Sequence, residues 1–114
     1  MNLRCRLEAP DQAACWTLLA RACCFSPEVM ARAAGLSVVQ LRRRCRERFG
    51  ETFGEWCRRE RMVAARQLLA ETESVKLTLN RLGYEHRSQM SRDFWRAYET
   101  TPTEWLRWFR GRWG

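Results

Sequence analysis

The sequence contains two related segments, and this internal repeat limits the possible folds more than any other feature. Gly35 is echoed by Gly83, and after one inserted residue the copies continue at an offset of 49. The matches at that offset are Leu41 with Met90, Arg43 with Arg92, Cys45 with Phe94, Phe49 with Tyr98, Thr52 with Thr101, Glu55 with Glu104, Trp56 with Trp105 and Arg58 with Arg107. Each copy predicts a short helix, a glycine turn, a basic helix and a capped helix. The repeat therefore indicates two helix-turn-helix units.

Helical periodicity covers almost the whole chain, and strand-like alternation of any length is absent from the sequence. Residues typical of helix N-caps stand at Ser26, Ser37, Thr52 and Thr101. The expected helices run from Asp11 to about Cys24, from Ser26 to just before Gly35, from Ser37 to Phe49, from Thr52 to about Ala70, from about Val75 to Leu82, from about Arg87 to Tyr98 and from Thr101 to about Phe109. The predicted fold class is all-α.

The length of 114 residues fits one domain, or two very small subdomains that share a core. We expect an N-terminal arm at residues 1–10, a folded region at 11–109 and a tail at 110–114. Within the folded region, the first helix-turn-helix unit takes about 11–50, a linking helix about 52–70, and the second unit about 74–109.

The charge of the chain indicates a polyanionic partner. The net charge is +8 and the pI is near 10, which favours binding to nucleic acid or to an anionic membrane face. No apolar run approaches the roughly 20 residues of a membrane-spanning helix. The basic start of the chain is interrupted by Glu8, Pro10 and Asp11 where a signal peptide would have its apolar core. We therefore expect a cytoplasmic protein.

Five arginines lie within residues 42–48 of the first basic helix, and helical geometry separates them into two groups. The inward face is predicted to consist of Val38, Leu41, Cys45 and Phe49. A second stripe, beside the core and directed away from it, consists of Val39, Arg42, Arg43 and Arg46. Arg44 and Arg48 flank the other side, where they can contact backbone phosphates, or pair with Glu47 in the case of Arg44 and with Glu51 or Glu55 in the case of Arg48. A groove could receive the stripe.

The second basic helix repeats this layout with different chemistry. Its inward face consists of Met90, Phe94 and Tyr98. The stripe equivalent to the first consists of Ser88, Ser91, Arg92 and Trp95. Small hydroxyls beside one arginine suit the reading of base edges better than a plain run of charge does.

The chain resembles the DNA-binding domain of the AraC/XylS family of bacterial transcription regulators. The segment "SPEVMARAAGLSVVQLRRRCRERFGETFGEW" is similar to the family's first helix-turn-helix, "RMVAARQLLAET" to its linking helix, and "LGYEHRSQMSRDFWRAYETTPTEW" to its second motif. The resemblance covers roughly residues 11–109. It implies seven helices, with two helix-turn-helix units joined by the helix near Thr52 to Ala70.

The resemblance also implies sequence-specific binding to double-stranded DNA. Each second helix would enter a major groove, and the two grooves would be successive turns of one duplex, about 34 Å apart. One chain could then bind as a monomer, and RNA polymerase is a candidate second partner. The base-contact candidates are Val39, Arg42, Arg43, Arg46, Arg87, Ser88, Ser91 and Arg92. Backbone amides at the helix starts near Thr52 and Thr101 are phosphate-contact candidates, together with Arg44 and Arg48.

The second unit departs from the family pattern at several positions. Thr78-Leu79 replaces a usual Ile-Ala, Trp95 a usual basic residue, and Glu99 a usual glycine. In the first unit, Cys45 replaces a usual phenylalanine. In the second unit, His86 replaces the usual capping serine of the basic helix. Neutral imidazole is a poor cap, and a protonated imidazole would meet the positive end of the helix dipole. We expect the second unit to be less stable, tuned to different DNA or partly degenerate.

Two alternatives to a specific regulator remain open. The six cysteines could serve a redox- or metal-responsive regulator, although CxxC pairs are absent and His86 is the single histidine. Cys15, Cys45 and Cys57 are expected to be small core residues. The other alternative is a non-specific or partly degenerate DNA-binding remnant. Enzyme activity and a cofactor are not expected, because the sequence has no paired carboxylates, phosphate-binding loop or Cys/His/Asp constellation.

Overall fold

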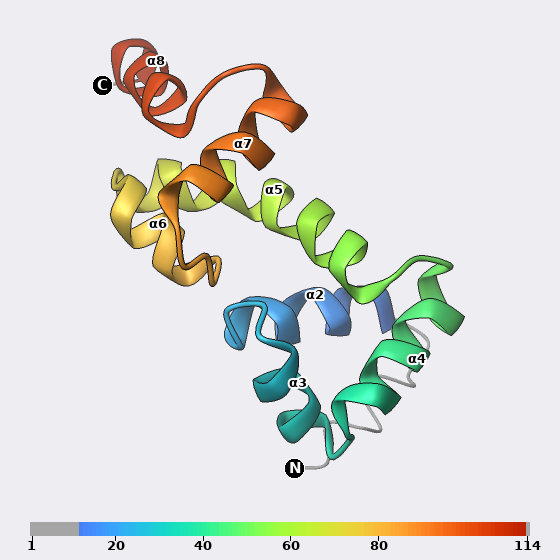
Figure 1. Cartoon of the computed structure of the whole chain (residues 1–114). Helices are drawn as coiled ribbons and strands as arrows, with labels where there is room; N and C mark the ends of the chain where they lie inside the picture. Colours follow the sequence, from blue (N-terminus) through green and yellow to red (C-terminus); the bar gives the residue numbers. More distant parts are fainter. Residues whose placement is uncertain (1–11, 114) are drawn as a thin grey trace. The chain divides into compact units, whose positions relative to one another are not determined.

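The computed structural model describes residues 12–113, and these form seven helices without a strand (Figure 1). The helices are α2 (Gln12–Ala22), α3 (Pro27–Ala34), α4 (Val38–Phe49), α5 (Phe53–Thr72), α6 (Val75–Arg81), α7 (Arg87–Tyr98) and α8 (Pro102–Trp113). The all-α prediction is confirmed. The chain divides into two compact units, one ending at Glu60 and the other beginning at Arg61.

Capping residues start the helices where the sequence predicted. The Ser26 hydroxyl accepts a hydrogen bond from the Val29 N–H, and Ser37 and Gln40 form a reciprocal capping box at the start of α4. The hydroxyls of Thr52 and Thr101 accept from the N–H groups three residues further on, at 3.2 and 3.1 Å. These side chains satisfy amides that a helix leaves unpaired in its first turn. Asp11, the predicted cap of the first helix, lies outside the described residues.

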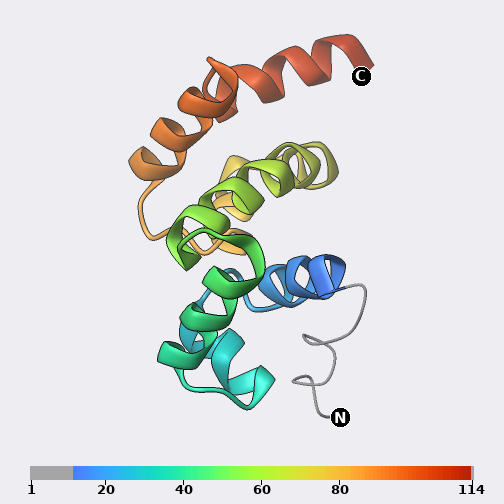
Figure 2. The same ribbon diagram turned by 90° about the vertical axis from the view of Figure 1, so that its right-hand side faces the viewer.

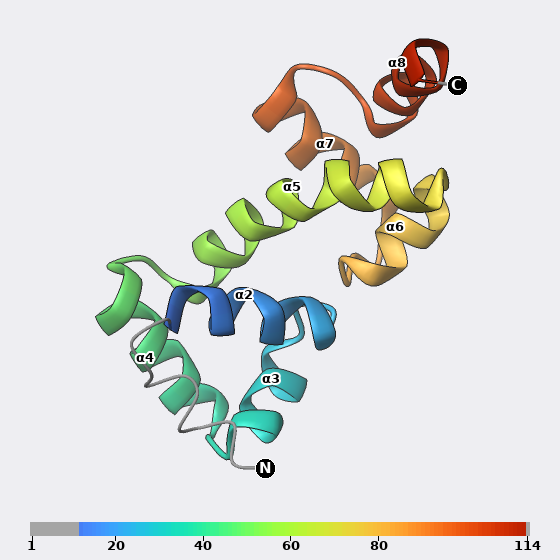
Figure 3. The ribbon, with the colours of Figure 1, turned by 180° about the vertical axis from the view of Figure 1, so that it is seen from behind.

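In the first unit, α2, α3 and α4 lie along three sides of a triangle (Figures 1 and 3). α3 packs against α4, and Gly35 joins them with a φ of 72°, a left-handed conformation that glycine adopts without strain. Trp16 of α2 meets Phe49 and Trp56 edge-on, with ring centroids 5.5 and 5.7 Å apart, and Phe49 stacks on Trp56. This aromatic cluster fixes α4 and the start of α5.

The second unit places the C-terminal half of α5, α6, α7 and α8 around a separate core. Leu69, Leu82, Met90 and Phe94 are fully buried. The Tyr98 hydroxyl donates to the carbonyl oxygen of Met62 and so ties the end of α7 to α5. α7 and α8 follow one another after a turn at residues 99–101 (Figure 2).

Helix ends differ from the predictions more than helix starts do. α5 continues to Thr72 rather than Ala70, and α8 continues through Gly111 to Trp113 rather than ending near Phe109. A single glycine costs a helix only about 1 kcal/mol, and Arg110 and Arg112 in the last turn favour the negative end of the helix dipole. Within the described part of the chain, the helices lack the combination of length and apolar character that crossing a membrane requires.

Candidate nucleic-acid interface

The stripe of α4 lies fully in solvent because the opposite face of the helix is buried. Leu41 and Cys45 are inaccessible, and Val38 and Phe49 are half-buried. All four stripe residues are exposed, Val39 at 66% and with it Arg42, Arg43 and Arg46. An exposed valine at the N-terminal end of the stripe, followed by arginines, gives this face both apolar and cationic contacts.

A hollow of about 430 Å³ separates this stripe from the start of α5. It is lined by Arg42, Arg43, Arg46, Thr52, Phe53 and Gly54. Three arginine residues and the N-terminus of a helix thus border one space. Both features attract a negative charge, the first by its net charge and the second by its unpaired amides and dipole.

The remaining arginines of α4 lie apart from the stripe. Arg44 is half-buried, whereas Arg48 is exposed. Glu51, a predicted partner of Arg48, instead pairs with Arg59 at 2.6 Å. Glu51 therefore forms its ion pair with an arginine of α5 rather than with one of α4.

The stripe of α7 also lies opposite a buried face of its own helix, but its composition is different. Met90 and Phe94 are fully buried on its inner face, and Tyr98 is half-buried. Ser88 and Arg92 are exposed, Ser91 is half-buried, and Trp95 is 54% exposed. A large aromatic side chain therefore stands in solvent where the first unit has Arg46.

Arg87, a predicted base contact, is turned toward the start of α8. Its guanidinium donates a hydrogen bond of 2.8 Å to the Thr103 hydroxyl. Arg87 is thus drawn away from the Ser88 stripe, and DNA binding by this residue would require that hydrogen bond to break.

The start of α7 lacks the side-chain cap found on α4. His86 occupies the N-cap position with φ −126° and ψ 131°, and its imidazole makes no capping hydrogen bond. The prediction that His86 is a poor cap is confirmed. The structure therefore offers one reason for the second recognition helix to be the less stable of the two.

A buried polar pair supports α7 and was missed by the sequence analysis. Asp93 is 8% exposed, and its carboxylate accepts a 2.7 Å hydrogen bond from the Tyr84 hydroxyl. Arg61 lies over the Tyr84 ring at 4.8 Å and donates to the Leu82 carbonyl. The repeat could have indicated this pair, because the two copies differ at both positions. Tyr84 stands where the first copy has Leu36, and Asp93 stands where it has Arg44.

Among residues 12–113, two of the cysteine thiols are buried, and burial keeps them from reacting with molecules in solution. Cys45 is inaccessible and Cys57 is buried as predicted, while Cys15 is only half-buried. Burial, and secondarily the charge of Glu51, raise the pKa of the Cys45 thiol to about 11, against the opposing effect of Arg59. Because the folded state holds this proton more tightly, its contribution to stability is present below pH 9.0 and is lost between pH 9.0 and about 11.

The fold and these exposed stripes together indicate the class of protein to which the chain belongs. Two helix-turn-helix units, each presenting a solvent-facing stripe from its second helix, are typical of proteins that bind double-stranded DNA. Among the described residues, no cluster of three or more His, Cys, Asp or Glu side chains could hold a metal ion.

A family model described as a helix-turn-helix domain matches residues 30–107, from the middle of α3 into α8. The chain belongs to this AraC-type helix-turn-helix family, and the resemblance found in the sequence is confirmed. It is therefore a DNA-binding helix-turn-helix regulator, in a family of regulators rather than of enzymes. No curated protein and no solved structure matches the chain.

Proposed function

We propose that this regulator binds a specific double-stranded DNA sequence by inserting α4 and α7 into successive major grooves. The observation that supports the proposal is the pair of exposed stripes, each on a helix whose other face is buried. The base-reading residues would be Val39, Arg42, Arg43 and Arg46 on α4, and Arg87, Ser88, Ser91 and Arg92 on α7.

The phosphate contacts would lie around these stripes. The hollow between Arg43 and Thr52 combines cationic side chains with helix-terminal amides, which suits a backbone phosphate beside the groove. By the repeat, Thr101 would serve the second unit in the same way. Arg44 and Arg48 are further candidates on the flank of α4.

Binding as a monomer follows from the two units in one chain, because a single copy carries both recognition helices. RNA polymerase is the candidate partner at a promoter. Sedimentation of the complex with one duplex tests the stoichiometry, and a complex with two chains per site would contradict the monomer proposal.

Selection from random duplexes, followed by affinity measurements at several salt concentrations, tests sequence specificity. The selected site should bind about 10³-fold or more tightly than random duplex at the same salt. Equal affinity for all duplexes would contradict specific binding and support the non-specific alternative. Two conserved blocks in the selected sequences, one helical turn apart, are expected from two recognition helices.

Alanine substitution distinguishes base contacts from phosphate contacts. Arg43→Ala or Arg92→Ala should cost about 1–3 kcal/mol of DNA binding and relax the preference at one block of the site. Arg58→Ala serves as the matched control, because Arg58 is an exposed arginine on α5 outside both stripes. A loss that is equal for all sequences would identify the residue as a phosphate contact.

A further inference from the structure

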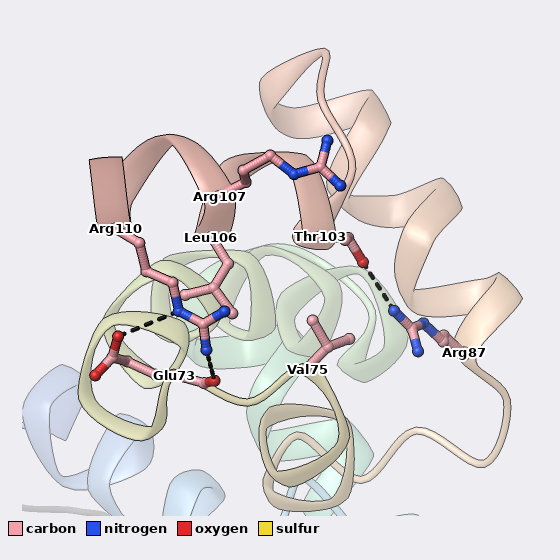
Figure 4. Close-up of a pocket in the computed structure, with 7 residues that line it drawn as sticks. All are labelled: Glu73, Val75, Arg87, Thr103, Leu106, Arg107 and Arg110. Carbon is pink, nitrogen blue, oxygen red and sulfur yellow. Dashed lines mark hydrogen bonds and ion pairs between the residues drawn. The ribbon is translucent and has the colours of Figure 1, made fainter. Parts of the chain in front are cut away.

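A hollow of about 360 Å³ in the second unit shares only Arg87 with the proposed DNA contacts. It is lined by Glu73, Val75, Arg87, Thr103, Leu106, Arg107 and Arg110 (Figure 4). Val75 and Leu106 point toward each other across its centre, with the Glu73–Arg110 pair on one side and the Arg87–Thr103 pair on the other. The hollow thus has an apolar floor and a charged rim.

The repeat indicates why the second unit is hollow here. Glu73 precedes the capping residue Ser74, as Phe25 precedes Ser26, and both residues have a left-handed φ, 51° and 59°. Phe25 is only 2% exposed, whereas the Glu73 side chain is 56% exposed. An aromatic side chain is therefore packed inside the first unit at a position where the second unit has an exposed carboxylate.

The three arginines on the rim differ in their hydrogen-bond partners. Arg110 is bound to Glu73 through both the carboxylate, at 3.2 Å, and the backbone carbonyl, at 2.6 Å. Arg87 has only the neutral Thr103 hydroxyl as its hydrogen-bond partner in the described part of the chain. Arg107 is exposed on the same rim. Two guanidinium groups are therefore left without a carboxylate partner among the residues that line the hollow.

We propose that this hollow binds a small monocarboxylate with an apolar body. The apolar body would lie on Val75 and Leu106, and the carboxylate would take a bidentate hydrogen bond from Arg87 with Arg107 nearby. The volume is at the lower end for ligand sites, which favours a small ligand. Since Arg110 is already paired with Glu73, the rim offers a carboxylate the guanidinium groups of Arg87 and Arg107.

Such a ligand would regulate DNA binding through Arg87. Bound to a carboxylate, Arg87 is held at α8 more firmly than by the Thr103 hydroxyl alone, because a charged acceptor strengthens the hydrogen bond. The ligand would therefore weaken DNA binding, and by linkage DNA would weaken ligand binding to the same degree. This consequence, unlike the site itself, rests on the proposed DNA contact of Arg87.

Phenylacetate is a suitable probe because it combines a phenylalanine-like body with one carboxylate. The full chain without DNA is titrated with phenylacetate, and NMR monitors the titration. The Val75 and Leu106 methyl signals should show chemical-shift changes that saturate. Phenylacetamide has the same shape without the charge, and it should bind about 10-fold to 100-fold more weakly. Equal affinities for the two compounds, or chemical-shift changes that never saturate, would overturn the proposal.

Two variants test the site. One fills the hollow with an aromatic side chain, and the other removes a positive charge from its rim. Glu73→Phe introduces the residue that the first unit carries at this position, so it should abolish phenylacetate binding and leave the helical content unchanged. Arg87→Ala removes the main carboxylate contact and should weaken binding about 10-fold to 100-fold. Arg58→Ala, the first-unit counterpart of Arg107, should leave the affinity unchanged. Retained affinity in both Glu73→Phe and Arg87→Ala would place the ligand elsewhere and refute the site.

A competition experiment separates this inference from the proposed function. At saturating phenylacetate, the affinity for the selected duplex should fall about fivefold or more, and Glu73→Phe should abolish that fall. Phenylacetate binding without any specific DNA binding would refute the proposed function alone. Specific DNA binding that phenylacetate leaves unchanged would refute the regulatory inference alone.

Discussion

The two helix-turn-helix units share a backbone plan, but an aromatic cluster packs the core of the first unit at positions where the second has smaller or more exposed side chains. In the first unit, Trp16 lies between α4 and α5 and contacts both Phe49 and Trp56. Trp16 falls opposite alanine in the second unit at either offset of the repeat, at Ala64 or Ala65. Trp105, the counterpart of the fully buried Trp56, is half-buried and stacks on Phe109 of its own helix instead.

At two positions of the repeat, the second unit has a polar residue where the first has a buried apolar one, Tyr84 for Leu36 and Glu73 for Phe25. Tyr84 and Asp93 form a buried hydrogen bond, and Glu73 pairs with Arg110 on the surface. Removing one partner of a buried hydrogen-bonded pair leaves the other unsatisfied, which costs about 1–3 kcal/mol. The comparison teaches that one helix-turn-helix plan can be held by aromatic packing in one unit and by buried hydrogen bonding in the other.

Replacement of Trp16 by alanine should produce the largest effect of the variants considered. Loss of a buried tryptophan costs about 3–5 kcal/mol, and the first unit should lose most of its protection against amide hydrogen exchange. Trp105→Ala is the matched variant in the second unit, and it should cost only about 1–2 kcal/mol because the side chain is half-buried. Similar losses from both variants would contradict the difference in packing.

Tyr84→Phe should destabilise the second unit by about 2 kcal/mol, because it leaves the buried Asp93 carboxylate without its hydroxyl donor. Urea denaturation measures the loss in free energy of unfolding. The double variant Tyr84→Phe/Asp93→Leu removes both polar groups and should recover most of it, since no buried charge then lacks a partner. A neutral Tyr84→Phe would show that the hydrogen bond contributes nothing to the stability of α7.

The sequence predicted the helix starts because their signals are local. Ser37 and Gln40 are three residues apart, and the capping box they form needs no contact with the rest of the chain. The buried and exposed faces of α4 and α7 followed in the same way from a period of 3.6 residues. Their role in binding DNA stays a prediction.

Features that depend on packing between segments could not be predicted. The hydrogen bond from Arg87 to Thr103 joins residues that are 16 positions apart, on two helices. The end of α8 also escaped prediction, because Arg110, next to Gly111, is held by Glu73 from a distant part of the chain. The repeat itself could have located Tyr84 and Asp93, if polar differences between the copies had been given the same weight as the matches.

A smaller effect is expected from the caps of the two recognition helices. His86→Ser should stabilise the second unit by about 1 kcal/mol, because the hydroxyl can accept from a first-turn amide of α7 that no side chain now caps. Ser37→Ala in the first unit should cost about the same. Amide hydrogen exchange at residues 87–90 and 38–41 measures both changes locally. No gain in protection in His86→Ser would show that a hydroxyl adds nothing to the hydrogen bond that the Gln89 N–H already donates to the His86 carbonyl.

The smallest expected effect concerns the residue that ends each recognition helix. Gly50 and Glu99 both cap with a left-handed φ, 70° and 56°, but only glycine adopts this conformation without strain. Glu99→Gly should therefore raise the free energy of unfolding by about 0.5–1 kcal/mol. Gly50→Ala is its mirror image in the first unit, and since a Cβ there would meet nothing within 4 Å, any loss measures backbone strain alone. If thermal melting shows a gain from Glu99→Gly that matches the loss from Gly50→Ala, then strain at the end of α7 accounts for a measurable part of the difference between the units. A loss on Glu99→Gly would instead mean that the glutamate side chain stabilises the turn by more than its backbone costs.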